Sequence, residues 1–146
     1  MKRTLPRLTL LAAAVVLASC STMHSMMNSS SSSQEVSLTG AQETPPVQTS
    51  ASGSGTVTVN ADHTVTADIS VTGMSATAAH IHEGPTGKAG KVIVPLTKEG
   101  DNHFVAPDGA KLNDEQYEAY KAGNLYVNVH SAQHPGGEVR AQLAAR

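Results

Sequence analysis

Short segments in which apolar and polar residues alternate occupy much of the chain from residue 36 onward. The clearest of them are residues 55–59, 64–71, 92–96, 125–130 and 138–143. Successive side chains of a β-strand point to opposite faces, so this alternation is typical of strands that line a core with one face. Because turn-forming residues separate the segments, we expect an all-β domain, a Greek-key β-sandwich or a related barrel.

Flanking residues refine this expectation. Residues 36–38 are expected to add an edge strand, and residues 60–63 to form the turn of a hairpin. Pro95 has no backbone N–H, so its strand should lie at a sheet edge or end at this residue. Aromatic residues are only 3% of the chain, so the core has to be built from Val, Ile, Leu and Ala.

One short helix is predicted over residues 113–122. Asn113 can cap its first turn, with Gln116 three residues later in the arrangement of a capping box. Gly123 is suited to end it. Leu112, Tyr117 and Tyr120 share one side, which we expect to pack on the sandwich.

The first 19 residues have the pattern of a secretory signal peptide. Basic residues precede an apolar run of ten residues, 8–17, which is too short to span a bilayer as a helix. The following residues, through Ser19 to Cys20, resemble the lipobox of bacterial lipoproteins. That resemblance implies cleavage before Cys20, a diacylglycerol thioether on its sulfur and acylation of the new N-terminus, which would anchor the chain stably. The alternative is an ordinary signal peptide followed by a chance cysteine.

These features predict three parts: a signal peptide over residues 1–19, a lipidated cysteine with a Ser-rich tether over 20–35, and a β-sandwich over 36–146. Ser21 follows the cysteine where an Asp would favour the inner membrane, so we expect an outer-membrane lipoprotein that faces the periplasm. Cys20 is the only cysteine, so the folded domain has no disulfide. The net charge of −2 gives no reason to expect nucleic acid as a partner. The expected partners are the membrane, through the lipid anchor, and other proteins of the cell envelope.

Histidines carry the strongest chemical signal. His80 and His82 flank Ile81, and residues two apart in a strand project from the same face. His130 ends the segment 125–130 on the face opposite its valines. If the two strands are neighbours, three imidazoles meet and could bind copper or zinc, although zinc commonly takes a fourth ligand. His134, in a loop rich in Pro and Gly, could join them. The alternative is that these rings form only structural hydrogen bonds.

Four separated segments resemble the CHRD domain, a family named for repeats in chordin and frequent in bacterial secreted proteins. They are residues 40–47 (GAQETPPV), 52–59 (SGSGTVTV), 80–84 (HIHEG) and 125–142 (LYVNVHSAQHPGGEVRAQ), and they occur in the order of the family. The resemblance covers residues 36–143. It implies an immunoglobulin-like or related Greek-key β-sandwich and does not imply a firm biochemical activity.

The segment 80–84 is also similar to a copper-ligand segment of copper/zinc superoxide dismutases. This shallower resemblance implies copper ligands at His80, His82 and His130, and a substrate-steering role for Arg140. It makes His103 the candidate for a ligand that bridges to zinc. The chain departs from those enzymes because the domain lacks their disulfide and their long zinc loop is not evident. Dismutase-like redox activity therefore rests on this resemblance alone.

Glu43 precedes two prolines, Pro45 and Pro46, that favour an extended kink. The kink could hold the carboxylate near the histidines, where it would orient an imidazole ring. A purely structural role, with backbone N–H groups or Arg140 as partners, is the alternative. Taken together, the sequence predicts an envelope lipoprotein whose domain binds a metal ion through clustered histidines, with copper as the expected metal and zinc as the alternative. The competing hypothesis is a structural or protein-binding module without a metal.

Overall fold

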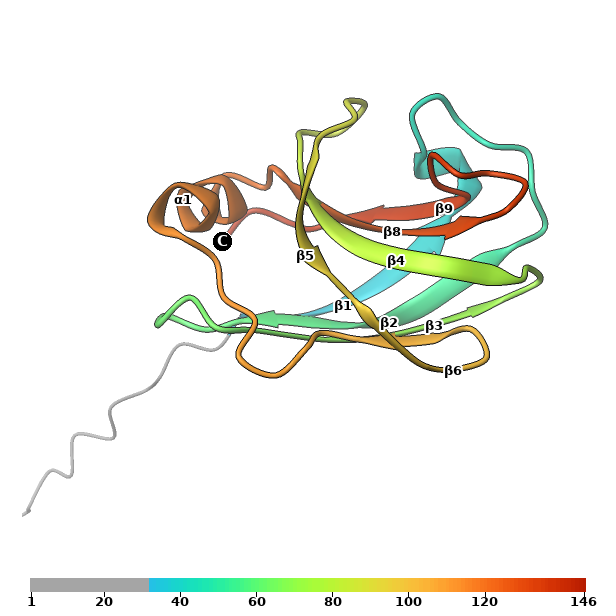
Figure 1. Cartoon of the computed structure of the whole chain (residues 1–146). Helices are drawn as coiled ribbons and strands as arrows, with labels where there is room; N and C mark the ends of the chain where they lie inside the picture. The colour runs from blue at the N-terminus through green and yellow to red at the C-terminus, as the bar shows by residue number, and fades with distance from the viewer. Residues whose placement is uncertain (1–31) are drawn as a thin grey trace, which may run out of the picture.

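Nine antiparallel strands and one short α-helix make up residues 32–146, the part of the chain that the computed structural model describes (Figure 1). The all-β prediction is therefore confirmed. The strands are β1 (Ser32–Thr39), β2 (Ser52–Val59), β3 (Val65–Thr72), β4 (Ala76–Glu83), β5 (Lys91–Pro95), β6 (Thr97–Gly100), β7 (His103–Val105), β8 (Leu125–Ser131) and β9 (Val139–Gln142). A 3-10 turn, η1 (Gly40–Gln42), follows β1, and the helix α1 (Asp114–Lys121) precedes β8.

The strands form one hydrogen-bonded sheet in the order β5-β4-β8-β9-β1-β2-β3-β7-β6. The sheet folds over itself into two layers, with β4, β5, β8 and β9 facing β1, β2, β3 and β6 (Figure 1). Strand β9 returns beside β1, so β9-β1-β2-β3 has the 4-1-2-3 order of a Greek key, with other elements inserted between β3 and β9. The sandwich expected from the alternating segments is thus present.

Strand β1 differs from the expectation of an edge strand over residues 36–38. It begins at Ser32 and lies inside the sheet, between β2 and β9. Residues 32–35 were not predicted as a strand, because the residue of this segment that points into the core is polar. Gln34 is buried, where its amide nitrogen donates to the Tyr120 hydroxyl and to the Ala144 carbonyl oxygen. A buried residue satisfied in this way lines the core without contributing to an apolar pattern.

The core lies between the two layers. It contains residues from both, among them Leu38, Val57, Ile69, Ile81, Val127 and Val129, together with Phe104 from β7. Strand β3 shows the strict alternation of buried and exposed residues that the sequence predicts. Strands β6 and β7 were not predicted, because β6 is exposed along its length and β7 is only three residues long.

The local predictions for turns and for the helix are confirmed. Asn60 and Thr64 close the β2–β3 hairpin. Asn113 and Gln116 form the reciprocal capping box of α1, and Gly123 follows the helix with a φ of 76°. The buried Tyr120 fixes the helix against the core. Pro95 is the last residue of β5, an edge strand.

The layer that contains β4, β8 and β9 is buried on its outer face as well. Every residue of β8 is buried. Three connections cover this outer face: residues 40–51, residues 84–90 and residues 132–138 (Figure 1). An enclosed polar layer therefore lies outside the apolar core, and the histidines singled out above lie in it.

The predicted signal peptide and Cys20 lie outside the described residues, as does most of the tether. Within residues 32–146, no helix has the length and apolar character needed to cross a membrane.

Candidate metal site

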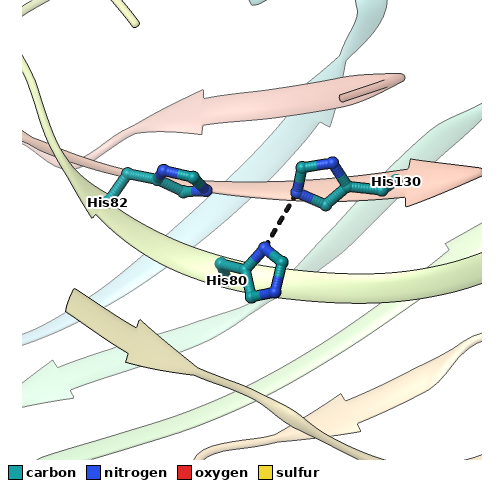
Figure 2. A group of neighbouring side chains, drawn as sticks. All are labelled: His80, His82 and His130. Carbon is teal, nitrogen blue, oxygen red and sulfur yellow. Dashed lines mark hydrogen bonds between the residues drawn. The ribbon is translucent and has the colours of Figure 1, made fainter. Parts of the chain in front are cut away.

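The three predicted histidines meet between β4 and β8, which are neighbours as the prediction required (Figure 2). In the register of this pair, Ala78 lies opposite His130 and His80 opposite Asn128. One ligand nitrogen from each of His80, His82 and His130 lies within 4.8 Å of the other two. Within the part of the chain that the structure describes, this cluster could hold a metal ion.

Hydrogen bonds select the ring nitrogens that face the cluster. Nδ1 of His82 lies 2.9 Å from the Gly90 carbonyl oxygen, and Nδ1 of His130 lies 3.0 Å from that of Pro135. A carbonyl oxygen only accepts, so in each neutral ring Nδ1 carries the proton and Nε2 presents a lone pair. Partners of this kind orient metal-binding histidines in proteins.

The ring of His80 presents Nδ1, rather than Nε2, to His130. Nδ1 of His80 lies 3.0 Å from Nε2 of His130, and the two share a hydrogen bond (Figure 2). Metal–imidazole bonds are about 2.0–2.1 Å long, so two neighbouring ligands of one ion stand roughly 3 Å apart. A metal could therefore replace the shared proton, and the ligand atoms that lie up to 4.8 Å apart would have to move closer for all three rings to bind one ion.

Burial keeps the three imidazoles neutral. It is the largest cause that lowers the pKa of His80, His82 and His130 below 6.5. The proximity of the other rings lowers the pKa of His80 and His82 further, while the carbonyl partners of His82 and His130 oppose the shift. Neutral imidazole is the metal-binding form, so the site is competent near neutral pH.

His82 is the most constrained of the three. Its ring stacks on Tyr126, with 4.8 Å between centroids and 5° between planes, and the residue is only 7% exposed. Its Nε2 is buried and has no hydrogen-bond partner. A buried polar atom without a partner is costly, so this nitrogen indicates a ligand or a cation at the cluster.

Gly90 supplies the carbonyl that orients His82, and this position requires glycine. A Cβ at residue 90 would collide with the backbone carbonyl of Glu83. The connection between β4 and β5 can thus fold closely over the strand end and present its carbonyl to the ring. The hydroxyl of Tyr126 accepts from the Gly90 N–H, which holds the same turn from the other side.

Glu43 is brought next to the cluster but not into the ligand group. The carboxylate is buried, and its Oε1 accepts a hydrogen bond from Nδ2 of Asn128 at 3.4 Å. Burial raises the pKa of Glu43 above 4.5, while Asn128 and the charge of Arg140 oppose the shift. Gly137 leaves room for this pair, since a Cβ there would overlap both side chains.

His134 and His103 lie outside the cluster. His134 is in the loop after β8, where its backbone N–H donates to the Ser131 hydroxyl. His103 lies on β7 in the other layer and pairs with Asp68 at 3.1 Å. The structure therefore does not place His103 where a bridging ligand would have to be.

Arg140 is buried and cannot steer a substrate, contrary to what the dismutase resemblance implies. The residue is only 2% exposed, and its guanidinium carbon lies 3.4 Å from the centroid of the Tyr126 ring. It donates to the carbonyl oxygens of Pro85 and Lys88 and to the side chain of Gln142. These contacts hold the β4–β5 connection on the sheet, so Arg140 is a structural anchor of the loop that orients His82.

Sequence reasoning missed Asn128 and Gly90 as parts of the site. The period of two that located His130 also places Asn128 on the same strand face, but this residue was not assigned a role in the site. Gly90 has no comparable signal, because only the closeness of two backbone segments reveals its role.

An all-β sandwich with a histidine cluster beneath covering loops is the class of protein that these observations define. The model of the CHRD domain matches residues 34–143, and the chain belongs to this family. No curated protein and no solved structure matches the chain.

Proposed function

We propose that this protein is a membrane-anchored, extracytoplasmic lipoprotein whose CHRD domain binds one copper ion through His80, His82 and His130. The observation that carries the metal assignment is the buried Nε2 of His82, which has no hydrogen-bond partner and faces two further imidazoles. Two of the three rings are held by carbonyl oxygens in the tautomer that a metal requires.

Copper is proposed rather than zinc because of the donor set. Imidazole suits both ions, and copper stands above zinc in the affinity order of nitrogen sites. The cluster holds no cysteine and no carboxylate within ligand distance among the described residues. Zinc is the runner-up, since it also accepts three histidines and a fourth ligand.

Anchoring at Cys20 is proposed from the sequence of the first 20 residues. With the lipid anchor and the histidine site together, the protein would capture copper at the surface of a membrane in the cell envelope. The proposed location is the periplasmic face of the outer membrane. Storage, delivery and protection from free copper are the roles that such a site would serve.

The test is metal analysis of the full chain, purified with detergent from membranes of copper-replete cells. About one copper per chain is expected in the wild type, and a strongly reduced amount in the variant His80→Gln/His82→Gln. Recovery of the chain without copper or zinc would refute the metal assignment and favour the structural or protein-binding module. Recovery of the wild type from the soluble fraction would refute the anchor.

A further inference from the structure

We propose that the amide oxygen of Asn128 is the fourth donor of the metal site and that it makes the site prefer Cu(II) over Cu(I). This inference rests on the proposed function, since it concerns the same ion. It adds a ligand that is neither a histidine nor an acidic residue, and it states the oxidation state of copper that the protein holds.

Asn128 is placed for this role by the register of β8. It lies directly opposite His80 on β4, and the next residue on the same face of β8 is His130. The side chain is 2% exposed, and its Oδ1 is buried without a hydrogen-bond partner. An orphan amide oxygen thus stands in the same enclosed layer as the three imidazoles.

Asn128 lies opposite His80 on β4, and two residues from Tyr126, whose ring stacks on that of His82. Nδ1 of His82 is bonded to Gly90, so its Nε2 is the buried nitrogen without a partner. In the neutral histidine Nε2 is an acceptor, and the amide oxygen of Asn128 is an acceptor as well. One cation bound at the cluster would satisfy both atoms.

Glu43 fixes which end of the amide points to the histidines. Its carboxylate accepts from Nδ2 of Asn128, so the amide nitrogen is turned toward Glu43 and the oxygen away from it. The missing side chain of Gly137 creates the space for this arrangement. Glu43 thereby acts on the site through Asn128, as a residue that positions a ligand.

The oxygen donor has a consequence for oxidation state. Soft sulfur ligands suit Cu(I), whereas carbonyl oxygens suit harder divalent ions. Three imidazoles alone serve both states of copper, so the added amide oxygen shifts the balance toward Cu(II). Removal of this oxygen should therefore weaken Cu(II) binding more than Cu(I) binding.

The experiment measures Cu(II) and Cu(I) affinities of the full chain by competition with chromophoric chelators. Asn128→Leu replaces the amide by an apolar group of similar size. The control is Gln34→Leu, which removes another buried amide, bonded to Tyr120 and Ala144 and not part of the histidine cluster. We expect Asn128→Leu to weaken Cu(II) binding about 10- to 100-fold, by analogy with the loss of other supporting groups at metal sites.

For Cu(I), we expect the affinity of Asn128→Leu to change less than about threefold, because an amide oxygen is a poor partner for that ion. The midpoint potential of the bound copper should rise by about 60 to 120 mV, at about 59 mV for each tenfold change in the affinity ratio. Gln34→Leu should retain Cu(II) affinity. Equal losses for both oxidation states, or no loss in Asn128→Leu, would overturn the proposal.

A measurement on the wild type tests whether Asn128 is a ligand even if the variants fold poorly. In the chain labelled with ¹³C at the asparagine side-chain carbonyl, pulsed electron paramagnetic resonance should detect hyperfine coupling of this carbon to Cu(II). Copper binding without such coupling would overturn the role of Asn128 and leave the histidine site standing. A chain that binds no copper would overturn both proposals, so the two failures are distinguishable.

Discussion

Replacement of His82 by alanine is the sharpest test of the histidine cluster, because this ring is buried and its free nitrogen faces the other two. A ligand that binds only the folded chain stabilises it by RT ln(1 + [L]/Kd), which is about 2.7 kcal/mol at a 100-fold excess over Kd. For a domain of this size, each kcal/mol raises the melting temperature by roughly 4 °C. Copper at that concentration should thus raise the Tm of the wild type by about 11 °C.

The variant should respond far less to the same copper concentration. Loss of one of three imidazoles is expected to weaken binding by about 100-fold, comparable to the largest effects of lost supporting groups at metal sites. The free copper concentration then equals Kd, and the stabilisation falls to about 0.4 kcal/mol, or less than about 2 °C. The substitution also removes the stack on Tyr126 and lowers the stability of the metal-free chain, so the copper-induced shift is compared within each variant.

The assay is thermal unfolding followed by circular dichroism, with and without copper, at pH 7. The matched control is His103→Ala, since His103 is partly exposed on the opposite layer and its side chain pairs with Asp68. His63 is a poorer control, because it has a φ of 70° and stacks on Tyr117. If His82→Ala shows the same copper-induced shift as the wild type, the cluster is not the binding site and the reasoning from its geometry is wrong.

Three further predictions concern the anchor, the charge of the histidines and the covering loop. Radiolabelled palmitate should enter the wild type and not Cys20→Ala; equal labelling of both would contradict lipidation. In pH titrations of the metal-free chain by nuclear magnetic resonance, the cluster histidines should protonate below pH 6.5, because burial lowers the pKa of each. Below pH 6.5 the unfolded chain therefore binds more protons than the folded chain, so the contribution of the cluster to stability is present above pH 6.5 and is lost as the pH falls. A titration midpoint above 6.5 for any of the three rings would contradict this prediction. Arg140→Met should lower the free energy of unfolding in urea by about 3 kcal/mol, since it removes a buried cation bonded to the carbonyls of Pro85 and Lys88. It should also weaken copper binding, because the loosened loop contains Gly90, which orients His82. Unchanged stability would show that the loop is held by other contacts.

Local patterns were sufficient to predict the fold class, the hairpin turn and the helix. The alternation of β3, the capping box at Asn113 and the position of Pro95 each depend on residues close together in the chain. Short-range geometry and chemistry specify these features, so they can be recognised in a single sequence. The shared strand face of His80 and His82 belongs to the same class of inference.

The extent of β1 and the two short strands β6 and β7 could not be predicted in this way. Gln34 points into the core because Tyr120 and Ala144, both far along the chain, satisfy its amide. Strand β6 has no buried residue, and its pairing with β7 alone makes it a strand. In these cases the residues or strands that define the structure are distant in sequence, so the local sequence pattern does not reveal it.

The candidate site likewise combines features that the local sequence specifies with features that it does not. The sequence by itself determined which residues have metal-binding chemistry and which strand faces they occupy. Only the tertiary structure decided that β4 and β8 are neighbours, that Gly90 and Pro135 orient two of the rings, and that Arg140 is a buried anchor. The physical reason is that ligand geometry depends on strand pairing and on backbone segments that approach one another across the fold, whereas residue type and side-chain direction are set within a few residues of the chain.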